Sequence, residues 1–370
     1  MPVVKADGYG HGAVHVARRL VREGAPILAV AVVEEGLELR RGGITAPILV
    51  MGWIGRDQLC SLVDGNLTPN IHSPEQAEEL KSFLEGEEGK AAVRSAPLPV
   101  HLKLDTGMTR LGVRPEALPR VLDLLDGMRG RIFLEGVFQN FASSDRSDDP
   151  QTEAQTHTFE EILSLVRSRG HRPSMIHTDN SAAMLVRLGN SPSKKSSLFE
   201  ISHVRPGLAL YTRVPGLPSE ANACLSDVMS FVSVVDQVKA VPPGTRVGYG
   251  GTFVCARETR IAIVPAGYAD GIPRHLSGRG QVLVGGRRCP IAGRVSMDMT
   301  AVDVTDLVAP PSRGGDVVFF GTQGGARLGA EEVATAADTV VWEVLCGVGP
   351  RVPRIILEGG RVIAQESKFL

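Results

Sequence analysis

Up to about residue 215, short apolar runs alternate with longer stretches whose apolar residues recur at helical spacing. Strands separated by helices form βαβ units, and such units build a parallel sheet. Together with the apolar run before Lys5, about eight strands predict an α/β fold, a closed (β/α)₈ TIM-type barrel. The predicted strands are 27–33, 47–51, 68–72, 100–104, 132–140, 174–178 and 203–211, and the predicted helices include 74–86, 115–128 and 151–169.

After residue 211 the pattern changes. A segment rich in proline, serine and alanine, 214–226, has the composition of a linker. Strand-like runs separated by turn residues follow it, with one helical stretch, and this pattern favours a mainly β domain. We therefore predict a barrel domain over 1–226 and a mainly β C-terminal domain over 227–370. The predicted strands there are 230–241, 260–265, 281–284, 299–304 and 316–320, and the predicted helix is 330–345.

The composition argues against several classes of protein. With 370 residues, of which 43% are hydrophobic, the chain can bury the cores of two domains. A net charge of −1 provides no basic field for nucleic acid. The five cysteines are scattered without a CxxC pair, which argues against a structural metal site or a disulfide framework and favours a reducing compartment. Without a run of transmembrane length or a signal peptide, we expect a cytoplasmic protein that acts on a small molecule, with no metal, nucleic-acid or membrane partner.

The turn after Lys5 is the first candidate for chemistry. Lys5 ends an apolar run and is followed by Gly8, Tyr9, Gly10 and Gly12. Glycines let the backbone turn sharply and approach a ligand, and barrels carry catalytic groups at the C-terminal ends of their strands. A surface lysine on an ordinary loop would show the same residues. The glycine spacing differs from GxGxxG, so it gives little support for dinucleotide binding.

Further candidates lie at strand ends, in apolar runs and in glycine-rich loops. The guanidinium of Arg110 suits a carboxylate ligand, although a solvated loop arginine is the alternative. Ser181 lies near the start of a helix, which suits either an anion site or a simple N-cap. Arg205 stands inside an apolar run, where burial without a partner is costly. Tyr249 and Tyr268 are flanked by glycines, so we predict phenols exposed on loops rather than packed in a core.

Taken together and in this order, the motifs resemble those of the alanine racemases, pyridoxal phosphate (PLP) enzymes of fold type III. The resemblance extends over nearly the whole chain. One motif alone would be weak evidence, whereas eight in the family's order are specific. The motifs are VVKADGYGHG, KLDTGMTRLGV, HTDNSAA, VRPGLALY, VGYGGTF, AGYADGIPR, GRVSMDMT and RVPR.

The resemblance implies two catalytic bases. By the match, Lys5 holds PLP covalently and serves as one base, while Tyr249 serves as the other and comes from the second subunit of a dimer. Racemisation uses such a pair because one group removes the α-proton and another delivers a proton to the opposite face. Each positioned acid or base typically accelerates a reaction by roughly 10²–10⁴-fold. A phenol is a poor base at neutral pH, so this role requires positive charge nearby.

The resemblance also implies a cofactor site. Arg205 matches the arginine that hydrogen-bonds the pyridine nitrogen of PLP, and His177 matches the residue that orients this arginine. Because a guanidinium does not give up its proton, the nitrogen stays unprotonated, which weakens the electron sink and favours reprotonation at Cα over transamination. The residues matched to the phosphate cradle and the remaining cofactor contacts are Tyr9, Asn180, Ser181, Gly207 and Leu208.

A substrate site follows from the same match. Arg110 corresponds to the arginine near the cofactor hydroxyl and the substrate carboxylate, and Lys103 matches a lysine that is carbamylated in some members and then steadies this arginine. The backbone N–H of Met297 corresponds to a carboxylate contact and Tyr268 to an entrance residue, both from the partner chain. The remaining supporting residues are Asn140 and Asp298.

Three features depart from the family's pattern. The family carries a leading segment before the lysine strand, so its absence suggests a misplaced gene start or a truncated protein. Asn140 stands where many members have a histidine beside the catalytic tyrosine, and its amide can hydrogen-bond but cannot titrate. Pro350 stands where many members have a tyrosine that touches the phosphate and narrows the entrance, which leaves strict alanine specificity open.

These residues are interpreted as a PLP-dependent racemase of L- and D-alanine that supplies D-alanine for peptidoglycan. It would act as a head-to-tail homodimer with shared active sites. The alternatives are a racemase of broader specificity for serine and other small amino acids, and a non-catalytic PLP carrier. A carrier needs neither a β domain nor a second base, so Tyr249 argues against it. A decarboxylase on this fold would place an acidic residue at the ring nitrogen, so Arg205 argues against that reaction.

Overall fold

The computed structural model describes residues 1–93, 96–146, 149–189 and 201–367. By its contacts the chain divides into two compact units, one of residues 1–8 with 13–225 and the other of residues 9–12 with 226–370. The predicted domain boundaries, 1–226 and 227–370, remain a prediction. Among the described residues, no helix is both long enough and apolar enough to cross a membrane.

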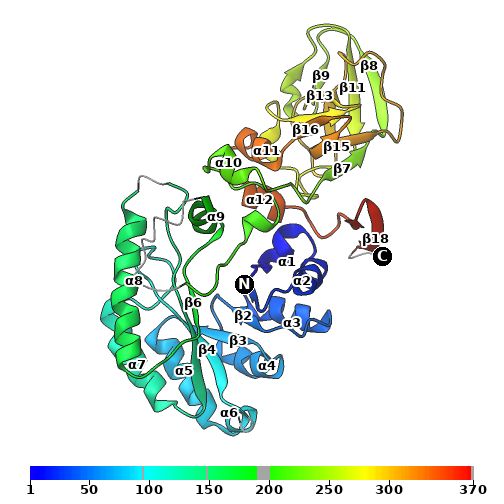
Figure 1. The fold of residues 1–370 in the computed structure, drawn as a ribbon. Helices are drawn as coiled ribbons and strands as arrows, with labels where there is room; N and C mark the ends of the chain where they lie inside the picture. The colour runs from blue at the N-terminus through cyan, green and yellow to red at the C-terminus, as the bar shows by residue number, and fades with distance from the viewer. Residues whose placement is uncertain (94–95, 147–148, 190–200, 368–370) are drawn as a thin grey trace. The chain divides into compact units, whose positions relative to one another are not determined.

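A curled parallel sheet forms the centre of the first unit, with helices α5, α7 and α8 on its outer side (Figure 1). In its described part, six strands pair in chain order, which confirms the predicted α/β fold of barrel type. Strands β1 and β2 are buried at every residue, as expected for parallel strands covered on both faces. The strands are β1 (Leu28–Val30), β2 (Ile48–Val50), β3 (Thr68–Ile71), β4 (Leu98–Lys103), β5 (Ile132–Phe138) and β6 (Met175–His177).

Two short segments connect the edges of this sheet. Val3 pairs in parallel with Ala29 of β1, and the Val3 N–H donates to the carbonyl of Pro206 at 2.9 Å. On the other edge, the Arg205 N–H donates to the carbonyl of Asp179, just after β6, at 2.8 Å. The chain thus runs around the barrel through eight segments, of which six are regular strands.

The prediction of a strand over 203–211 is wrong. Pro206 has no N–H for a ladder, and Gly207 adopts φ −115° and ψ −90°, which is not an extended conformation. The chain then enters a short 3₁₀ helix, η3 (Leu208–Leu210). Leu208 and Tyr211 are buried, whereas Val204 and Leu210 are half-buried, so the segment contributes to the core without forming a regular strand.

The predicted helices of the first unit are confirmed. Ser73 caps α5 because its Oγ accepts the N–H of Gln76 at 3.2 Å, and Pro74 occupies the first helical position. The stretch 115–128 divides into η2 (Pro115–Ala117) and α7. The α-helices are α1 (Lys5–Gly10), α2 (Ala13–Arg22), α3 (Val33–Arg41), α4 (Leu59–Asp64), α5 (Pro74–Glu85), α6 (Glu87–Ala92), α7 (Leu118–Gly127), α8 (Gln151–Ser168), α9 (Ser181–Gly189) and α10 (Ser219–Asn222), and η1 (Arg56–Gln58) precedes α4.

A half-buried arginine joins α3 to the end of α4. Arg40 donates through Nε to the carbonyl of Gly65 at 2.8 Å and through Nη2 to that of Asn66 at 2.8 Å. Its Nη1 donates to the carbonyls of Ile44 and Ala46, both at 2.7 Å. A cation at a helix C-terminus is favourable because the last carbonyls carry partial negative charge.

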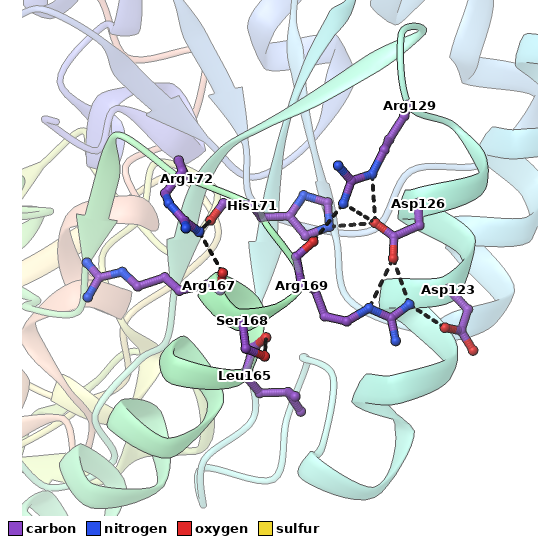
Figure 2. Close-up of polar contacts among 9 residues, drawn as sticks. All are labelled: Asp123, Asp126, Arg129, Leu165, Arg167, Ser168, Arg169, His171 and Arg172. Atoms are coloured by element: carbon purple, nitrogen blue, oxygen red, sulfur yellow. Dashed lines mark hydrogen bonds and ion pairs between the residues drawn. The ribbon is translucent and has the colours of Figure 1, made fainter.

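Figure 2 shows an ionic cluster that joins the C-terminal ends of α7 and α8. Asp126 accepts hydrogen bonds from Arg129, with Nη2 at 2.6 Å, and from Arg169, with Nη2 at 2.6 Å. Arg169 also contacts Asp123 at 2.5 Å, and Nε2 of His171 lies 3.2 Å from Asp126. Burial alone would raise the pKa of Asp126, but the hydrogen bonds from Arg169 and Arg129 lower it below its usual range.

The second unit is mainly antiparallel β, as predicted. In its described part, one sheet has the order β14-β11-β8, and another contains β13, β12, β15 and β16, with β7 paired to β15. Two hairpin-like pairs, β9 with β10 and β17 with β18, complete it. The strands are β7 (Phe231–Val234), β8 (Gln237–Val241), β9 (Arg246–Val247), β10 (Phe253–Val254), β11 (Thr259–Val264), β12 (Gln281–Val284), β13 (Arg287–Pro290), β14 (Thr300–Asp303), β15 (Asp316–Gln323), β16 (Ala326–Leu328), β17 (Arg354–Glu358) and β18 (Arg361–Glu366).

Two predicted elements of this unit are divided. The run 230–241 forms two strands in different sheets, because Val235 bonds to Gly315 and Asp236 bonds to Ile263 where the chain crosses between the sheets. The predicted helix 330–345 ends early, since Asp338 has a φ of 56° and cannot continue a right-handed helix. The observed elements are α11 (Ala330–Ala336) and α12 (Val341–Cys346), and η5 (Arg274–Leu276) precedes β12.

Candidate active site

The turn that begins at Lys5 has an unusual backbone. Lys5 is half-buried and follows the fully buried Val4. A positive φ is accessible to glycine but costs about 1–2 kcal/mol for a residue with a side chain. Such strain is maintained by surrounding contacts and is concentrated at functional sites. In α1 the φ angles of Ala6, Asp7, Gly8, Tyr9 and Gly10 are 52°, 54°, 59°, 55° and 80°, so α1 is a left-handed turn.

Glu35, in the first turn of α3, holds this turn in place. Its Oε1 accepts the N–H of Ala6 at 2.6 Å, and its Oε2 accepts the N–H of Ala31 at 2.7 Å. Asp7 accepts the N–H of Ala13 at 2.8 Å on the other side of the turn. One carboxylate therefore ties the residue after Lys5 to the end of β1. Sequence reasoning missed Glu35, because acidic residues are common in the first turn of any helix.

Arg205 is buried and almost fully hydrogen-bonded. Its Nη1 donates to Nδ1 of His177 at 2.9 Å and to the carbonyl of His177. Its Nη2 donates to the carbonyls of Gln139 at 2.5 Å and Thr178 at 3.1 Å, and the Asn140 Oδ1 lies at 3.5 Å. Burial lowers the pKa of Arg205 to about 10, so it stays charged at neutral pH. Among the described residues, nothing accepts a hydrogen bond from its Nε–H, so one charged donor remains available to a ligand.

Lys103 brings more positive charge to the same end of the sheet. It is buried at the end of β4, with Nζ 5.6 Å from the ring centre of Phe138. Burial is the main cause that lowers its pKa to about 8, and the positive charges of Arg110, Arg205 and Lys5 contribute to the same shift. Arg110 is exposed in the loop after β4. Cations that converge at the C-terminal ends of strands favour an anionic ligand.

Ser181 occupies a small nest of backbone N–H groups. Its Oγ accepts the N–H of Gly207 at 2.9 Å and that of Ala209 at 3.2 Å. Asn180 is the N-cap of α9, since its Oδ1 accepts the N–H of Ala183 at 3.0 Å. Two N–H groups beside a helix N-terminus can bind a phosphate oxygen as well as a hydroxyl. This part of the chain therefore has the donors that a phosphate group requires.

The second unit carries exposed candidates. Tyr249, in η4 (Tyr249–Gly251), is 72% exposed, Met297 is 52% exposed and Tyr268 is 43% exposed, in agreement with the predicted loop phenols. Arg351 links the loops of the last two, because it bonds to Asp270 at 2.7 Å and to Asp298 at 2.8 Å.

Two family models cover most of the chain. The model described as "Alanine racemase, N-terminal domain" matches residues 1–215, and "Alanine racemase, C-terminal domain" matches residues 228–356. The chain belongs to the alanine racemase family. All the candidate residues lie within these two matches.

Individual alanine racemases are similar over nearly their whole length. The enzyme of Halothermothrix orenii is 40% identical over 96% of this chain and 89% of its own, and that of Sorangium cellulosum is 42% identical over 96% and 91%. Among solved structures, alanine racemase of Bacillus anthracis with bound L-Ala-P has a TM-score of 0.87 at 33% identity, covering 100% of this chain and 90% of that one. The Bartonella henselae enzyme with covalently bound pyridoxal phosphate has a TM-score of 0.80 at 26% identity, covering 94% and 89%.

The candidate residues of this alanine racemase family member fall into two groups. Within the first unit, the geometry brings His177 and Asn140 to Arg205, brings Ser181 to Gly207, and places Lys103 within electrostatic reach of Lys5. Tyr9 is buried in the left-handed turn, and Pro350 is exposed. The first unit contains Lys5, Lys103, Arg110, Asn140, His177, Asn180, Ser181, Arg205, Gly207 and the buried Leu208, and the second contains Tyr9, Tyr249, Tyr268, Met297 and Asp298.

Proposed function

We propose that this chain interconverts L- and D-alanine with PLP held covalently by Lys5. The observation that carries the proposal is the buried Arg205, whose Nη1 and Nη2 make four hydrogen bonds while its Nε–H meets no acceptor in the part of the chain that the structure describes. A guanidinium donates but does not transfer its proton, so a pyridine nitrogen bound to it stays unprotonated. That arrangement suits racemisation better than transamination or decarboxylation.

The donors of this chain suit PLP. The N–H groups of Gly207 and Ala209, which meet at the Ser181 hydroxyl, would hold the phosphate together with that hydroxyl. Tyr9, four residues after Lys5, is a further proposed phosphate ligand on the basis of its motif, as is Leu208, and Asn180 is a proposed cofactor contact. When bound, PLP supplies an electron-accepting ring that stabilises the negative charge left on Cα after a proton departs.

Two bases would move the proton. The amine of Lys5 holds or delivers it at one face of the substrate Cα, and the phenol of Tyr249 of the partner subunit does so at the opposite face. A phenol needs positive charge nearby to act as a base at neutral pH, and in the shared site the cations Lys103, Arg110 and Arg205 would supply such a field. Arg110 and the backbone of Met297 would hold the substrate carboxylate, and Tyr268 would limit the size of the side chain.

The second base implies a head-to-tail homodimer with shared sites. Tyr249 is 72% exposed on the single chain, and Met297 and Met299, in a different loop of the same unit, are each about half exposed. These exposures support a surface that a second copy covers. Asp298, bonded to Arg351, would fix this loop. We propose further that the enzyme works in the cytoplasm and supplies D-alanine for peptidoglycan.

Purified protein tests the proposal directly. We expect absorbance near the edge of the visible range that disappears on treatment with borohydride, and peptide mapping should then find the reduced cofactor on Lys5. The same preparation should form D-alanine from L-alanine, detected with a D-amino-acid oxidase. Reduced cofactor on another lysine would refute the assignment of Lys5, and a preparation with bound PLP but no D-alanine formation would refute racemisation.

A further inference from the structure

A chain of buried hydrogen bonds extends from Arg205 across three neighbouring strands. Nδ1 of His177, at the end of β6, lies 2.9 Å from the Arg205 Nη1. Nε2 of His177 lies 2.8 Å from Nδ1 of His101 on β4, and Nε2 of His101 lies 3.2 Å from Oε2 of Glu135 on β5. Both imidazoles are fully buried, while the Glu135 side chain is 21% exposed. The chain thus leads from the candidate site to a carboxylate that reaches solvent.

The direction of these hydrogen bonds follows from the arginine. A guanidinium has only donors, so the Nδ1 of His177 must accept and cannot carry a proton. Burial lowers the pKa of His177 well below its usual range and also lowers that of His101, although Glu135 opposes the shift of His101. Each ring is therefore neutral and carries one proton. His177 carries it on Nε2 and donates to His101, which carries its proton on Nε2 and donates to Glu135.

The packing around the two rings shows that this arrangement is built into the sheet. Gly136 pairs with His101 across the strands, and a Cβ at Gly136 would lie 2.4 Å from Nδ1 of His101, so a larger residue there would displace the ring. On the other side, the ring of Phe138 stacks on that of His177, with centres 4.7 Å apart and planes 10° apart. Gly136 thus leaves room for the imidazole of His101, and Phe138 packs against the imidazole of His177.

We propose that His101 and Glu135 are positioning residues that hold His177 in its Nε2–H form and thereby orient Arg205. In the opposite tautomer, Nδ1–H of His177 would face Nη1–H of Arg205, and two buried donors would oppose each other. Arg205 would then shift, and its Nε–H would no longer stay aligned for a ligand. The role of Arg205 toward the pyridine nitrogen rests on the proposed function, whereas the tautomer of His177 does not.

Ring ¹⁵N shifts of selectively labelled histidine test the proposal in the protein without cofactor. The His177 signal, identified by its loss in His177→Gln, should show a protonated Nε2 and an unprotonated Nδ1. Glu135→Leu removes the last acceptor and should shift His177 toward a mixture of tautomers. Glu135→Gln should retain the wild-type tautomer, because its amide oxygen still accepts from His101. Glu116→Leu, at an exposed glutamate, is the matched control and should leave the His177 signal unchanged.

Activity provides a second readout. In the enzyme with PLP, Glu135→Leu should lower kcat for alanine roughly ten- to a hundredfold with a smaller change in KM. The reason is that the Nδ1–H of His177 would then face the Nη1–H of Arg205 in part of the molecules. Glu135→Gln should restore most of that loss. A protonated Nδ1 or an imidazolium at His177 in the wild-type protein would overturn the proposal, and so would wild-type tautomers and kcat in Glu135→Leu. If Glu135→Leu does not fold, Glu135→Met, which has a similar length and no strong acceptor, replaces it in both measurements. If the protein does not bind PLP, only the proposed function fails, since the tautomer is still measured.

Discussion

Lys103 should make the folded protein less stable than an uncharged residue of the same length would. Its pKa falls from 10.5 in the unfolded chain to about 8 in the fold, chiefly because of burial. Each unit corresponds to about 1.36 kcal/mol, so the charged lysine costs about 3 kcal/mol at pH 7. We expect Lys103→Met to raise the free energy of unfolding of the cofactor-free protein by an amount of about this size.

The pH dependence gives the sharper form of this prediction. Between pH 8 and 10.5 the unfolded chain binds more protons at Lys103 than the fold does, so stability rises with pH in that window. The cost should fall from about 3 kcal/mol at pH 7 to about 2 kcal/mol at pH 9, and the advantage of Lys103→Met should shrink by that difference. The variant should also lose activity, because the proposed support of Arg110 is removed.

Denaturant unfolding, monitored by circular dichroism, measures the free energy of unfolding of each protein at pH 7 and at pH 9. The buffer must be free of bicarbonate so that the amine is not carbamylated. Lys239→Met, at an exposed lysine of β8, is the control and should change stability little at either pH. A Lys103→Met protein that is less stable than the wild type at pH 7, or whose advantage is the same at pH 9, would refute the reasoning.

Three further predictions concern other residues. Asp126→Asn should lower the free energy of unfolding by about 1–2 kcal/mol at pH 7. Because the pKa of Asp126 is lowered in the fold, this difference should begin to shrink below about pH 4 and vanish once the folded carboxyl is protonated; a loss that persists in strong acid would speak against the ionic cluster as its cause. Arg40→Met should cost about 2–4 kcal/mol in thermal or urea unfolding, since four carbonyls lose a charged donor, and a neutral result would mean that water replaces the guanidinium. Pro350→Tyr should raise the ratio of kcat/KM for alanine to that for serine by a factor equivalent to about 1–3 kcal/mol. The variant should also bind PLP more tightly, and an unchanged ratio would show that Pro350 does not determine specificity.

Local signals account for the parts of the fold that the sequence predicts correctly. The helix over 74–86 is recognisable because the adjacent Ser73 and Pro74 provide a cap and a first-turn proline. The buried runs of β1 and β2 need no distant partner to be identified as strands. In both cases the decisive interactions lie within a few residues along the chain.

Distant contacts explain what the sequence does not reveal. The segment 203–211 has a strand-like composition, but Gly207 bonds to Ser181 instead of a ladder, and that partner lies 26 residues away. The same holds for Glu35, which reaches Ala6 across 29 residues. His101 sits inside an ordinary apolar strand, and only the pairing of three strands brings it to His177. Motifs along one stretch of chain predict residues that face a ligand, whereas residues that support them become visible only in the fold.

Subunit complementation tests most directly the claim that Lys5 and Tyr249 of two different chains form one active site. Lys5→Ala and Tyr249→Phe proteins should each be nearly inactive alone. After the two are mixed and allowed to exchange subunits, half of the dimers are heterodimers, each with one site that holds both bases. Activity should therefore recover to about a quarter of the wild-type value. An inactive mixture, with heterodimers demonstrated by native mass spectrometry, would contradict the shared site.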